Sequence, residues 1–110
     1  MIGVYCIKNK INNKRYIGQS INIENRLVSH KRNEKSILLV RAFEKYGLEN
    51  FDFFVLEECS QEKLDDRERF YIKLFKSNDL DFGYNLTEGG EHGIRGPLSK
   101  ESLAKKKKNM

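Results

Sequence analysis

Two short apolar segments at the start of the chain constrain its fold most strongly. Residues 2–7 and 16–19 are largely apolar, and the polar segment 8–15 between them contains three asparagines, which tolerate turn geometry. This pattern predicts an antiparallel β-hairpin with a long turn. Each predicted strand carries a tyrosine beside a glycine, as Gly3-Val4-Tyr5 and Tyr16-Ile17-Gly18. Taken alone, two strand tyrosines are expected to pack in a core.

The composition indicates one small domain. Among 110 residues, seven Phe and five Tyr supply a core, and no apolar run approaches the roughly 18 residues of a membrane span. Because no charged segment leads into a long apolar core at the N-terminus, we expect no signal peptide. Cys6 and Cys59 are too few for a disulfide framework or a metal site, so we expect free thiols in a reducing cytoplasm.

The net charge of +5 is distributed unevenly along the chain. Residues 1–45 carry +7, residues 46–94 carry −7 and residues 95–110 carry +5. A basic half, an acidic half and a basic tail suit a polyanion bound next to a cation. Ordinary solvated charged faces are equally consistent with this pattern.

Apolar periodicity predicts a first helix from residue 23, with Asn22 as its N-cap, and a second helix over residues 37–46. Ser36 can cap the N-terminus of the second helix, and Gly47 is suited to end it. Three residues share the apolar face of the first helix, namely Ile23, Leu27 and His30, with Arg26 at its edge. The Arg26 and His30 pair is either an edge arginine beside a satisfied histidine or a functional pair.

Residues 51–57 predict a strand, and because both of its faces are apolar we expect it to be central. A third helix is predicted over residues 61–75, capped by Ser60. Three of its acids are expected to point away from its apolar face, namely Glu62, Asp65 and Asp66. Glu68 instead lies about 40° from Leu64, inside the apolar stripe.

Glu68 is the acid that needs an explanation, because burying a carboxylate costs several kcal/mol unless it is paired, protonated or metal-bound. Two interpretations remain open. Glu68 forms a salt bridge at the edge of the core, for which Arg26 is a candidate, or it is a metal ligand.

The end of the chain predicts a structured loop or edge strand at residues 84–86, where Asn85 could cap, bridge or coordinate. Four glycines in residues 89–96 indicate a linker, and a capped basic helix is predicted after Pro97. Phosphate-binding glycine loops, zinc motifs and nucleophile elbows are absent from the sequence. The remaining polar inventory suits phosphodiester hydrolysis, which needs a cation, a proton acceptor and arginine.

Five elements occur in order along residues 1–90: Gly3-Val4-Tyr5, Tyr16-Ile17-Gly18, Arg26 with His30, Glu68 in Asp66-Arg-Glu-Arg-Phe-Tyr-Ile, and Gly83-Tyr84-Asn85. Together they resemble the GIY-YIG nuclease family, most closely the catalytic domain of phage and intron homing endonucleases. The segment from His92 to Glu101 resembles the start of a nuclease-associated DNA-binding module.

The resemblance implies an α/β fold of α+β type, with a small three-stranded antiparallel sheet flanked by helices. Residues 1–88 would be the catalytic domain, and residues 89–110 the linker and the basic start of a DNA-binding module. The implied function is a metal-dependent DNA endonuclease of the homing type, acting as a monomeric domain in the cytoplasm of a bacterial or phage-infected cell. A catalytically inactive nucleic-acid-binding module of the same fold is the alternative, as is a restriction or repair nuclease.

The resemblance also implies the site residues. The catalytic set is Tyr5, Tyr16, Arg26, His30, Glu68 and Lys8. Tyr5 would accept the proton of the attacking water, helped by a positive charge on Lys8, since free tyrosine has a pKa near 10. Tyr16 would orient the phosphate or the water, and Arg26 would bind the scissile phosphate with His30 assisting.

Asn85 would support substrate binding, and Glu68 would hold one divalent metal ion, Mg²⁺ or alternatively Mn²⁺. No organic cofactor is expected. Two departures from the family pattern are Val4 in place of isoleucine and the lack of a second histidine in residues 31–36. If Tyr5 and Tyr16 are catalytic, both hydroxyls are expected to be exposed at one concave face.

Overall fold

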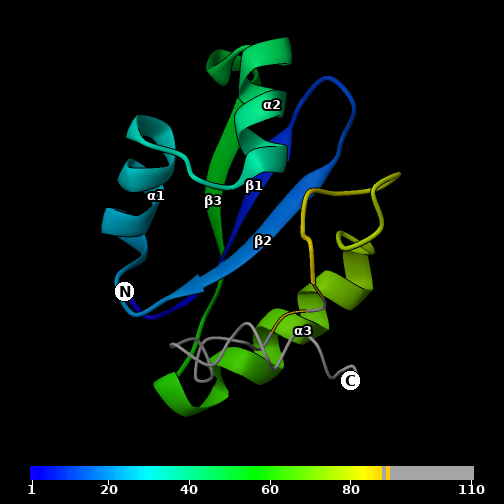
Figure 1. Cartoon of the computed structure of the whole chain (residues 1–110). Coiled ribbons are helices and arrows are strands. Elements are labelled where there is room, and N and C mark those ends of the chain that lie inside the picture. Colours follow the sequence, from blue (N-terminus) through cyan, green and yellow to red (C-terminus); the bar gives the residue numbers. More distant parts are fainter. Residues whose placement is uncertain (88, 90–110) are drawn as a thin grey trace, which may run out of the picture.

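The computed structural model describes residues 1–87 and residue 89, which form a three-stranded antiparallel sheet with helices on both faces (Figure 1). The strands are β1 (Gly3–Asn9), β2 (Arg15–Ser20) and β3 (Phe51–Glu58), in the order β2-β1-β3. The predicted hairpin and fold class are confirmed. The predicted linker beyond Gly89 and the predicted basic helix lie outside the described residues.

Three helices complete the fold: α1 (Ile23–Arg32), α2 (Ile37–Tyr46) and α3 (Leu64–Phe75). Short 3₁₀ turns, Leu48–Asn50 and Gln61–Lys63, lead into β3 and α3. The predicted bounds of the second helix are confirmed. The third helix was predicted to begin at residue 61, but its first turn is 3₁₀ and the α-helix begins three residues later.

The helix caps agree with the sequence in part. Asn22 caps α1 through its side chain, which accepts a hydrogen bond from the Asn25 N–H. Ser36 and Ser60 stand at the predicted positions, but neither side chain makes a capping hydrogen bond. The N-terminus of α2 is instead served by Glu34, which accepts from the Ser36 N–H at 2.8 Å.

Alternating side chains of β1 face two different hydrophobic clusters. Tyr5 and Ile7 pack in the cluster with residues of α1 and α2, whereas Val4 and Cys6 pack with Ile72 of α3. The sheet therefore lies between α1 and α2 on one face and α3 on the other. Both faces of the central strand are covered, and its four buried apolar side chains, Val4 to Ile7, alternate between the two clusters.

The prediction that the third strand is central was wrong, because β3 is an edge strand paired only with β1. Phe51 and Phe53 belong to the cluster under α2, but Phe54 and Val55 on β3 are 37% and 39% exposed. Apolar residues on both faces of a strand therefore did not indicate a central position here. The central strand is β1, in which five residues in a row are buried.

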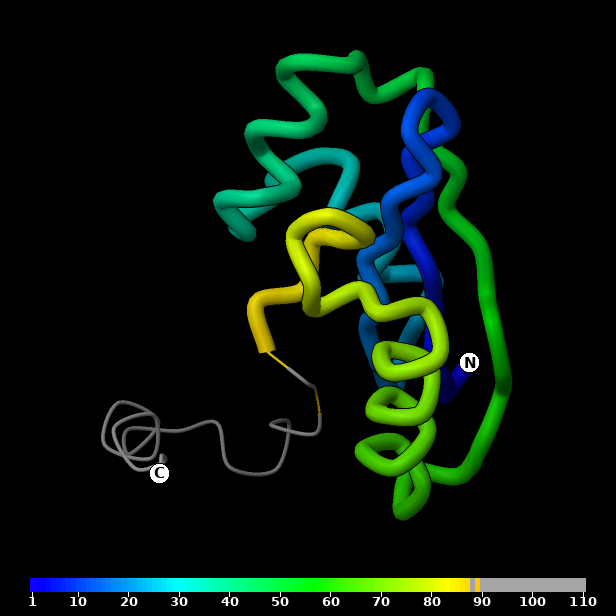
Figure 2. The backbone as a smooth tube through the Cα atoms, turned by 90° about the vertical axis from the view of Figure 1, so that its right-hand side faces the viewer, coloured from blue at the N-terminus to red at the C-terminus, as the bar shows by residue number. Residues whose placement is uncertain are grey.

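The segment after α3 returns between α2 and α3 and lies along the free edge of β2 (Figure 2). Gly83 forms an isolated parallel bridge with Arg15, and the Tyr84 N–H donates to the Arg15 carbonyl at 2.9 Å. This segment is a structured loop, one of the two predicted alternatives. The loop covers the first half of the β2 edge, from Arg15 to Ile17.

None of the helices in the described part of the chain is long and apolar enough to cross a membrane. Both cysteines are free, as expected. Burial raises the pKa of the Cys6 thiol to about 12, so this thiol stays protonated.

Gly18 on β2 faces Tyr5 on β1 directly in the register of the hairpin. A Cβ atom at Gly18 would lie 2.3 Å from both Cζ and Oη of Tyr5, far inside van der Waals contact. The Tyr5 ring is buried and cannot swing aside. The missing side chain of Gly18 therefore makes the space into which the Tyr5 ring extends toward the edge of the sheet.

We expect Gly18→Ala to destabilise the fold by about 1–3 kcal/mol, because overpacking forces buried groups to shift. Urea unfolding followed by circular dichroism measures this loss. In a Tyr5→Leu background, which removes the contacted ring atoms, the same substitution should be much less harmful. An equal loss in both backgrounds would contradict the proposed ring contact, and Ser29→Ala on the exposed side of α1 serves as the control.

Candidate active site

The Tyr5 hydroxyl is buried and engaged inside the fold. Tyr5 is only 1% exposed, and its hydroxyl is 2.7 Å from Nε2 of His30 on α1. Tyr16 is partly buried, and its ring packs edge-on against the His30 ring with centroids 5.6 Å apart. The expectation that both tyrosines expose their hydroxyls was therefore wrong for Tyr5. The reason is that β1 is the central strand, covered on both faces.

A third residue, Glu34, completes this buried chain. Its Oε1 hydrogen-bonds Nδ1 of His30, and both side chains are 8% exposed. A carboxylate only accepts hydrogen bonds, so Nδ1 carries the proton in this contact. In neutral His30 the opposite atom, Nε2, is then an acceptor, and the Tyr5 hydroxyl donates to it. The geometry fixes the order of the chain as Tyr5, His30, Glu34.

Sequence reasoning missed Glu34 because it lies beyond the end of α1, in the charged link to α2. The spacing of four from His30 was the only available signal. The second carboxylate oxygen accepts from the backbone N–H groups of Lys35 and Ser36 at 3.0 and 2.8 Å. These bonds fix the carboxylate, and its negative charge lies near the N-terminus of α2, where it is favoured.

The environment shifts the pKa values of both ends of the chain. Burial raises the pKa of Tyr5 far above its usual value; the Tyr16 hydroxyl and the Glu68 charge add to this, and Arg26 opposes it. Burial also acts to raise the pKa of Glu34, but hydrogen bonds from His30 and from the backbone outweigh it and hold the pKa below its usual range. Glu34 is therefore ionised at neutral pH, whereas Tyr5 is protonated.

Arg26 and Glu68 approach Tyr5 from different helices. Arg26, exposed on α1, is close enough for its guanidinium to lower the Tyr5 pKa, and the Glu68 carboxylate on α3 acts in the opposite direction. Glu68 is partly buried, as its place in the apolar stripe predicted, and accepts a hydrogen bond from Gln19 of β2 at 2.9 Å. An arginine, a carboxylate and a phenol hydroxyl thus converge at the β2 side of the sheet.

Glu68 has the oxygen donors that a hard divalent cation prefers, and Asp65, one turn away on α3, adds a second carboxylate. Among residues 1–87 and 89, no group of three or more His, Cys, Asp or Glu residues could hold a metal ion. The donor set therefore fits an ion that keeps several waters or substrate oxygens as ligands, which is the usual mode of Mg²⁺.

Asn85 and Lys8 are placed differently from the other predicted site residues. Asn85 is buried, and its amide both accepts from the Ile17 N–H and donates to the Ile17 carbonyl, each at 2.8 Å. Ser77 donates to the same Asn85 oxygen at 2.7 Å. This amide pins the loop to the β2 edge beside Tyr16, and all its hydrogen bonds are made inside the fold.

Lys8 does not lie beside Tyr5. Three positions along a strand reverse the side-chain direction, so Lys8 shares the face of Val4 and Cys6, and its charge acts on the Cys6 thiol. The expected help of Lys8 to Tyr5 is not supported by this placement. The cation near Tyr5 is Arg26.

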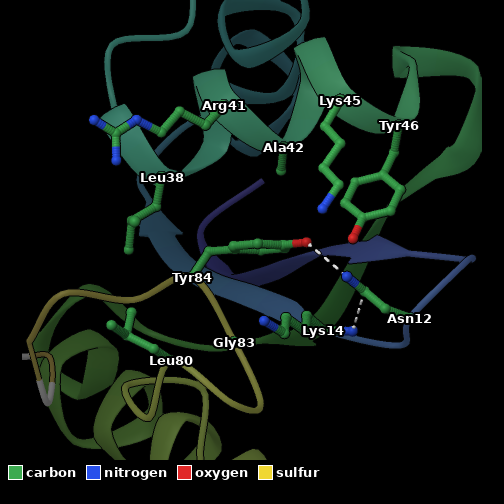
Figure 3. A pocket seen from close by; sticks show the side chains of 10 residues that line it. All are labelled: Asn12, Lys14, Leu38, Arg41, Ala42, Lys45, Tyr46, Leu80, Gly83 and Tyr84. Atoms are coloured by element: carbon green, nitrogen blue, oxygen red, sulfur yellow. Dashed lines mark hydrogen bonds between the residues drawn. The ribbon is translucent and has the colours of Figure 1, made fainter.

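A basic pocket of about 280 Å³ lies between α2 and the β1–β2 turn (Figure 3). Three cations line it, Lys14 on the turn and Arg41 and Lys45 on α2, and no acid does. The Tyr84 ring lies across it, with its hydroxyl accepting from Asn9 at 3.0 Å. Because Tyr84 precedes Asn85, this pocket adjoins the covered part of the β2 edge.

Comparison with known proteins gives one family. The family model described as the GIY-YIG catalytic domain matches residues 1–85. Intron-associated endonuclease 1 of Enterobacteria phage T4 is 34% identical over an aligned length of 117 residues. The alignment covers 98% of this chain and 46% of the phage protein. Probable intron-encoded endonuclease 1 of Neurospora crassa is 38% identical over 86 residues, covering 71% of this chain and 28% of the fungal protein. The chain spans less than half the length of these relatives.

Two solved structures agree with the family match. The catalytic domain of the homing endonuclease I-TevI has a TM-score of 0.71 at 34% identity, over 79% of this chain and 99% of that domain. A mutant of the catalytic domain of intron endonuclease I-TevI has a TM-score of 0.69 at 35% identity, over 80% and 95%. The likeness therefore covers nearly all of the described residues.

The depressed pKa of Glu34 has a consequence for stability. An acid with a lowered folded-state pKa stabilises the fold above its unfolded-state pKa and loses this contribution as the pH falls through the folded value. We expect Glu34→Gln to be about 1–3 kcal/mol less stable than the wild type at pH 6, with the difference shrinking below about pH 4.

Chemical denaturation between pH 6 and pH 3 measures this difference. Glu44→Gln, at an exposed acid on α2, is the matched control and should follow the wild type throughout. A Glu34→Gln difference that stays constant over the whole range would show that the ionised carboxylate is not what stabilises the chain of hydrogen bonds.

Proposed function

The chain belongs to the GIY-YIG catalytic-domain family, and we propose that it is the catalytic module of a metal-dependent DNA endonuclease of the homing type. The observation that carries the proposal is the Tyr5–His30–Glu34 chain, with Arg26 and Glu68 approaching the same hydroxyl. The endonuclease activities of the phage and fungal relatives support it, although those proteins are more than twice as long.

Tyr5 is proposed as the group that takes the proton of the attacking water. Burial opposes the phenolate, so the proton must have an acceptor, and Nε2 of His30 is 2.7 Å away. Transfer to Nε2 leaves a phenolate and an imidazolium, and the Glu34 carboxylate stabilises the imidazolium. The phenolate oxygen then accepts a proton from water while the water oxygen bonds to phosphorus and the bond to the leaving oxygen breaks.

Arg26 is proposed to bind the scissile phosphate and the charge that develops on it, because its guanidinium is exposed and close to Tyr5. Tyr16, partly buried against His30, orients the water or the phosphate. Glu68 would hold the divalent ion, Mg²⁺ in the first place, which when bound supplies electrostatic stabilisation of the phosphate oxygens. Asn85 supports this arrangement through the β2 backbone.

DNA is proposed as the substrate because the described surface offers positive charge without acidic partners in the pocket between α2 and the β1–β2 turn. Among the residues that the structure describes, Lys14, Arg41 and Lys45 form no ion pair with an acid, and the Lys45 ammonium lies over the Tyr46 ring. A pocket with three cations and no acid suits a backbone phosphate. We place this contact beside the scissile phosphate, on the same strand edge.

We further propose that residues 1–88 act as a monomeric catalytic domain without an organic cofactor, in the cytoplasm of a bacterial or phage-infected cell. Residues 89–110 would tether the domain to a separate DNA reader. Since residues 1–94 carry no net charge, the DNA affinity of the domain itself is modest and its sequence preference weak.

Nicking of supercoiled plasmid DNA with Mg²⁺ tests the activity. Tyr5→Phe, Arg26→Ala and Glu68→Ala should each lower the nicking rate by about 100-fold or more, since each removes a group that acts on the reacting atoms. Tyr71→Phe, which alters a tyrosine on α3 that binds Glu57, is the control and should nick normally. If the wild type binds DNA but nicks with neither Mg²⁺ nor Mn²⁺, the chain is a binding module instead.

The pocket is tested through the salt dependence of DNA binding. We expect the double variant Arg41→Ala with Lys45→Ala to bind a DNA duplex more weakly and to reduce the slope of log affinity against log salt by about 2. The double variant Lys63→Ala with Lys73→Ala removes the same charge from exposed positions outside the pocket. Equal slopes for the two double variants would show that the pocket makes no specific phosphate contact.

A further inference from the structure

The Tyr84 hydroxyl, at one end of the basic pocket, accepts hydrogen bonds from two fixed amides. Nδ2 of Asn9 donates to it at 3.0 Å and Nδ2 of Asn12 at 3.4 Å. The Asn9 oxygen accepts from the Ile11 N–H at 2.8 Å. The Asn12 oxygen accepts from the Lys14 N–H at 2.9 Å. Neither amide can therefore turn to offer the hydroxyl an oxygen without losing its backbone partner.

The proton of this hydroxyl is left without an acceptor. A hydroxyl group accepts two hydrogen bonds and donates one, and N–H groups take both accepting positions of Tyr84. Tyr84 donates its own proton to no residue among 1–87 and 89. The residue is only 7% exposed, and it lines the pocket. Because buried polar groups are almost always hydrogen-bonded, this donor favours a ligand that accepts.

The groups that surround this end of the pocket can also donate. Figure 3 shows the Lys45 ammonium and the Tyr46 hydroxyl directed toward the same space as the Tyr84 hydroxyl. Lys14 and Arg41 line the pocket as well, and no acid does. A fitting ligand must accept several hydrogen bonds and carry negative charge. A phosphate oxygen meets both conditions, whereas the edge of a neutral base meets only the first.

We propose that Tyr84 is a phosphate-binding residue, whose hydroxyl donates to a non-bridging oxygen of one phosphate of the DNA backbone. The proposed function supplies the identity of DNA, on which this inference rests, and a directional donor is added to the charges of the pocket. Lysine is a flexible point charge that attracts a phosphate from many directions. The Tyr84 hydroxyl, with two N–H groups behind it, donates in one direction and so fixes where the phosphate lies.

The backbone ties Tyr84 to the strand that carries Tyr16. The Tyr84 N–H donates to the Arg15 carbonyl at 2.9 Å. The next residue, Asn85, bonds both backbone groups of Ile17 at 2.8 Å. A phosphate held by Tyr84 is therefore held in a fixed place relative to Tyr16. Such a contact carries no sequence information, but it sets which bond of the bound strand reaches the catalytic hydroxyls.

Titration of the full chain with inorganic phosphate, without DNA or metal, tests the contact on the free protein. With ¹³C at Cζ, each of the five tyrosines gives one signal, which responds to hydrogen bonding of its hydroxyl. We expect the Tyr84 signal to move and to saturate. The Tyr71 signal should stay, because its hydroxyl already donates to Glu57. The signals are assigned through bonds in the wild type, so this readout needs no folded variant of Tyr84.

Two lysine variants separate the pocket from general attraction of anions. Lys45→Gln should bind phosphate about fivefold more weakly, because it removes a charge beside the Tyr84 hydroxyl. Lys63→Gln, at an exposed position outside the pocket, should bind as the wild type does. If phosphate leaves the Tyr84 signal in place, or if sodium chloride at equal ionic strength moves it as far, the proposal is overturned.

A short DNA duplex without metal distinguishes a backbone phosphate from free phosphate as the ligand. We expect the duplex to move the Tyr84 signal in the same direction as phosphate does, and added phosphate to have no further effect. Tyr84→Phe should bind the duplex about tenfold more weakly, since a hydrogen bond to a charged group is lost. Tyr71→Phe is the matched control, and circular dichroism checks that both variants are folded. A duplex that binds without moving the Tyr84 signal would overturn the assignment to DNA.

These measurements separate this proposal from the proposed nuclease function, because none of them requires cleavage. A wild type that nicks plasmid DNA while its Tyr84 signal responds to neither phosphate nor duplex would overturn the phosphate contact and leave the nuclease intact. A Tyr84 signal that responds to both, in a chain that does not nick, would support the contact and overturn the nuclease.

Discussion

The arrangement of this domain depends on one buried hydroxyl. Tyr5 lies on the central strand, where a polar atom without a partner is costly, and His30 satisfies it at 2.7 Å. That contact orients α1 on the sheet. Glu34 then fixes the imidazole and, through its second oxygen, the start of α2. One chain of hydrogen bonds therefore links the central strand to α1 and to the start of α2.

The second constraint is that β2 is an edge strand with both halves of its edge in use. The first half is covered by the loop that Asn85 pins to the Ile17 backbone. Near the second half, Gln19 contacts the acids of α3. Gly18 stands between these two and leaves room for the Tyr5 ring. Side chains from opposite faces of the sheet, those of α1 and those of α3, thereby come together at one strand.

Local signals in the sequence were sufficient for the hairpin, the bounds of α2, the Asn22 cap and the partial burial of Glu68, because each depends on neighbours within a few residues. Non-local contacts decided the rest. Strand order made β1 central, which buried Tyr5 and left β3 at the edge. Glu34 follows the end of α1, and the partner of Asp65 is Gln19 on β2. A helical wheel drawn from one helix shows neither contact.

The division of charge along the chain gains a physical meaning from this arrangement. Tyr5, Arg26 and His30 come from the basic half of the sequence, whereas Glu68 and Asp65 come from the acidic half. The site lies where the two halves meet. Arg26 and Glu68 both act on the Tyr5 hydroxyl, so a phosphate that binds Arg26 there would also meet the negative charge of Glu68, which repels it. Under the proposed function, a divalent cation at the carboxylates of Glu68 and Asp65 would reduce this repulsion, so we expect the binding of the cation and the binding of DNA to favour each other.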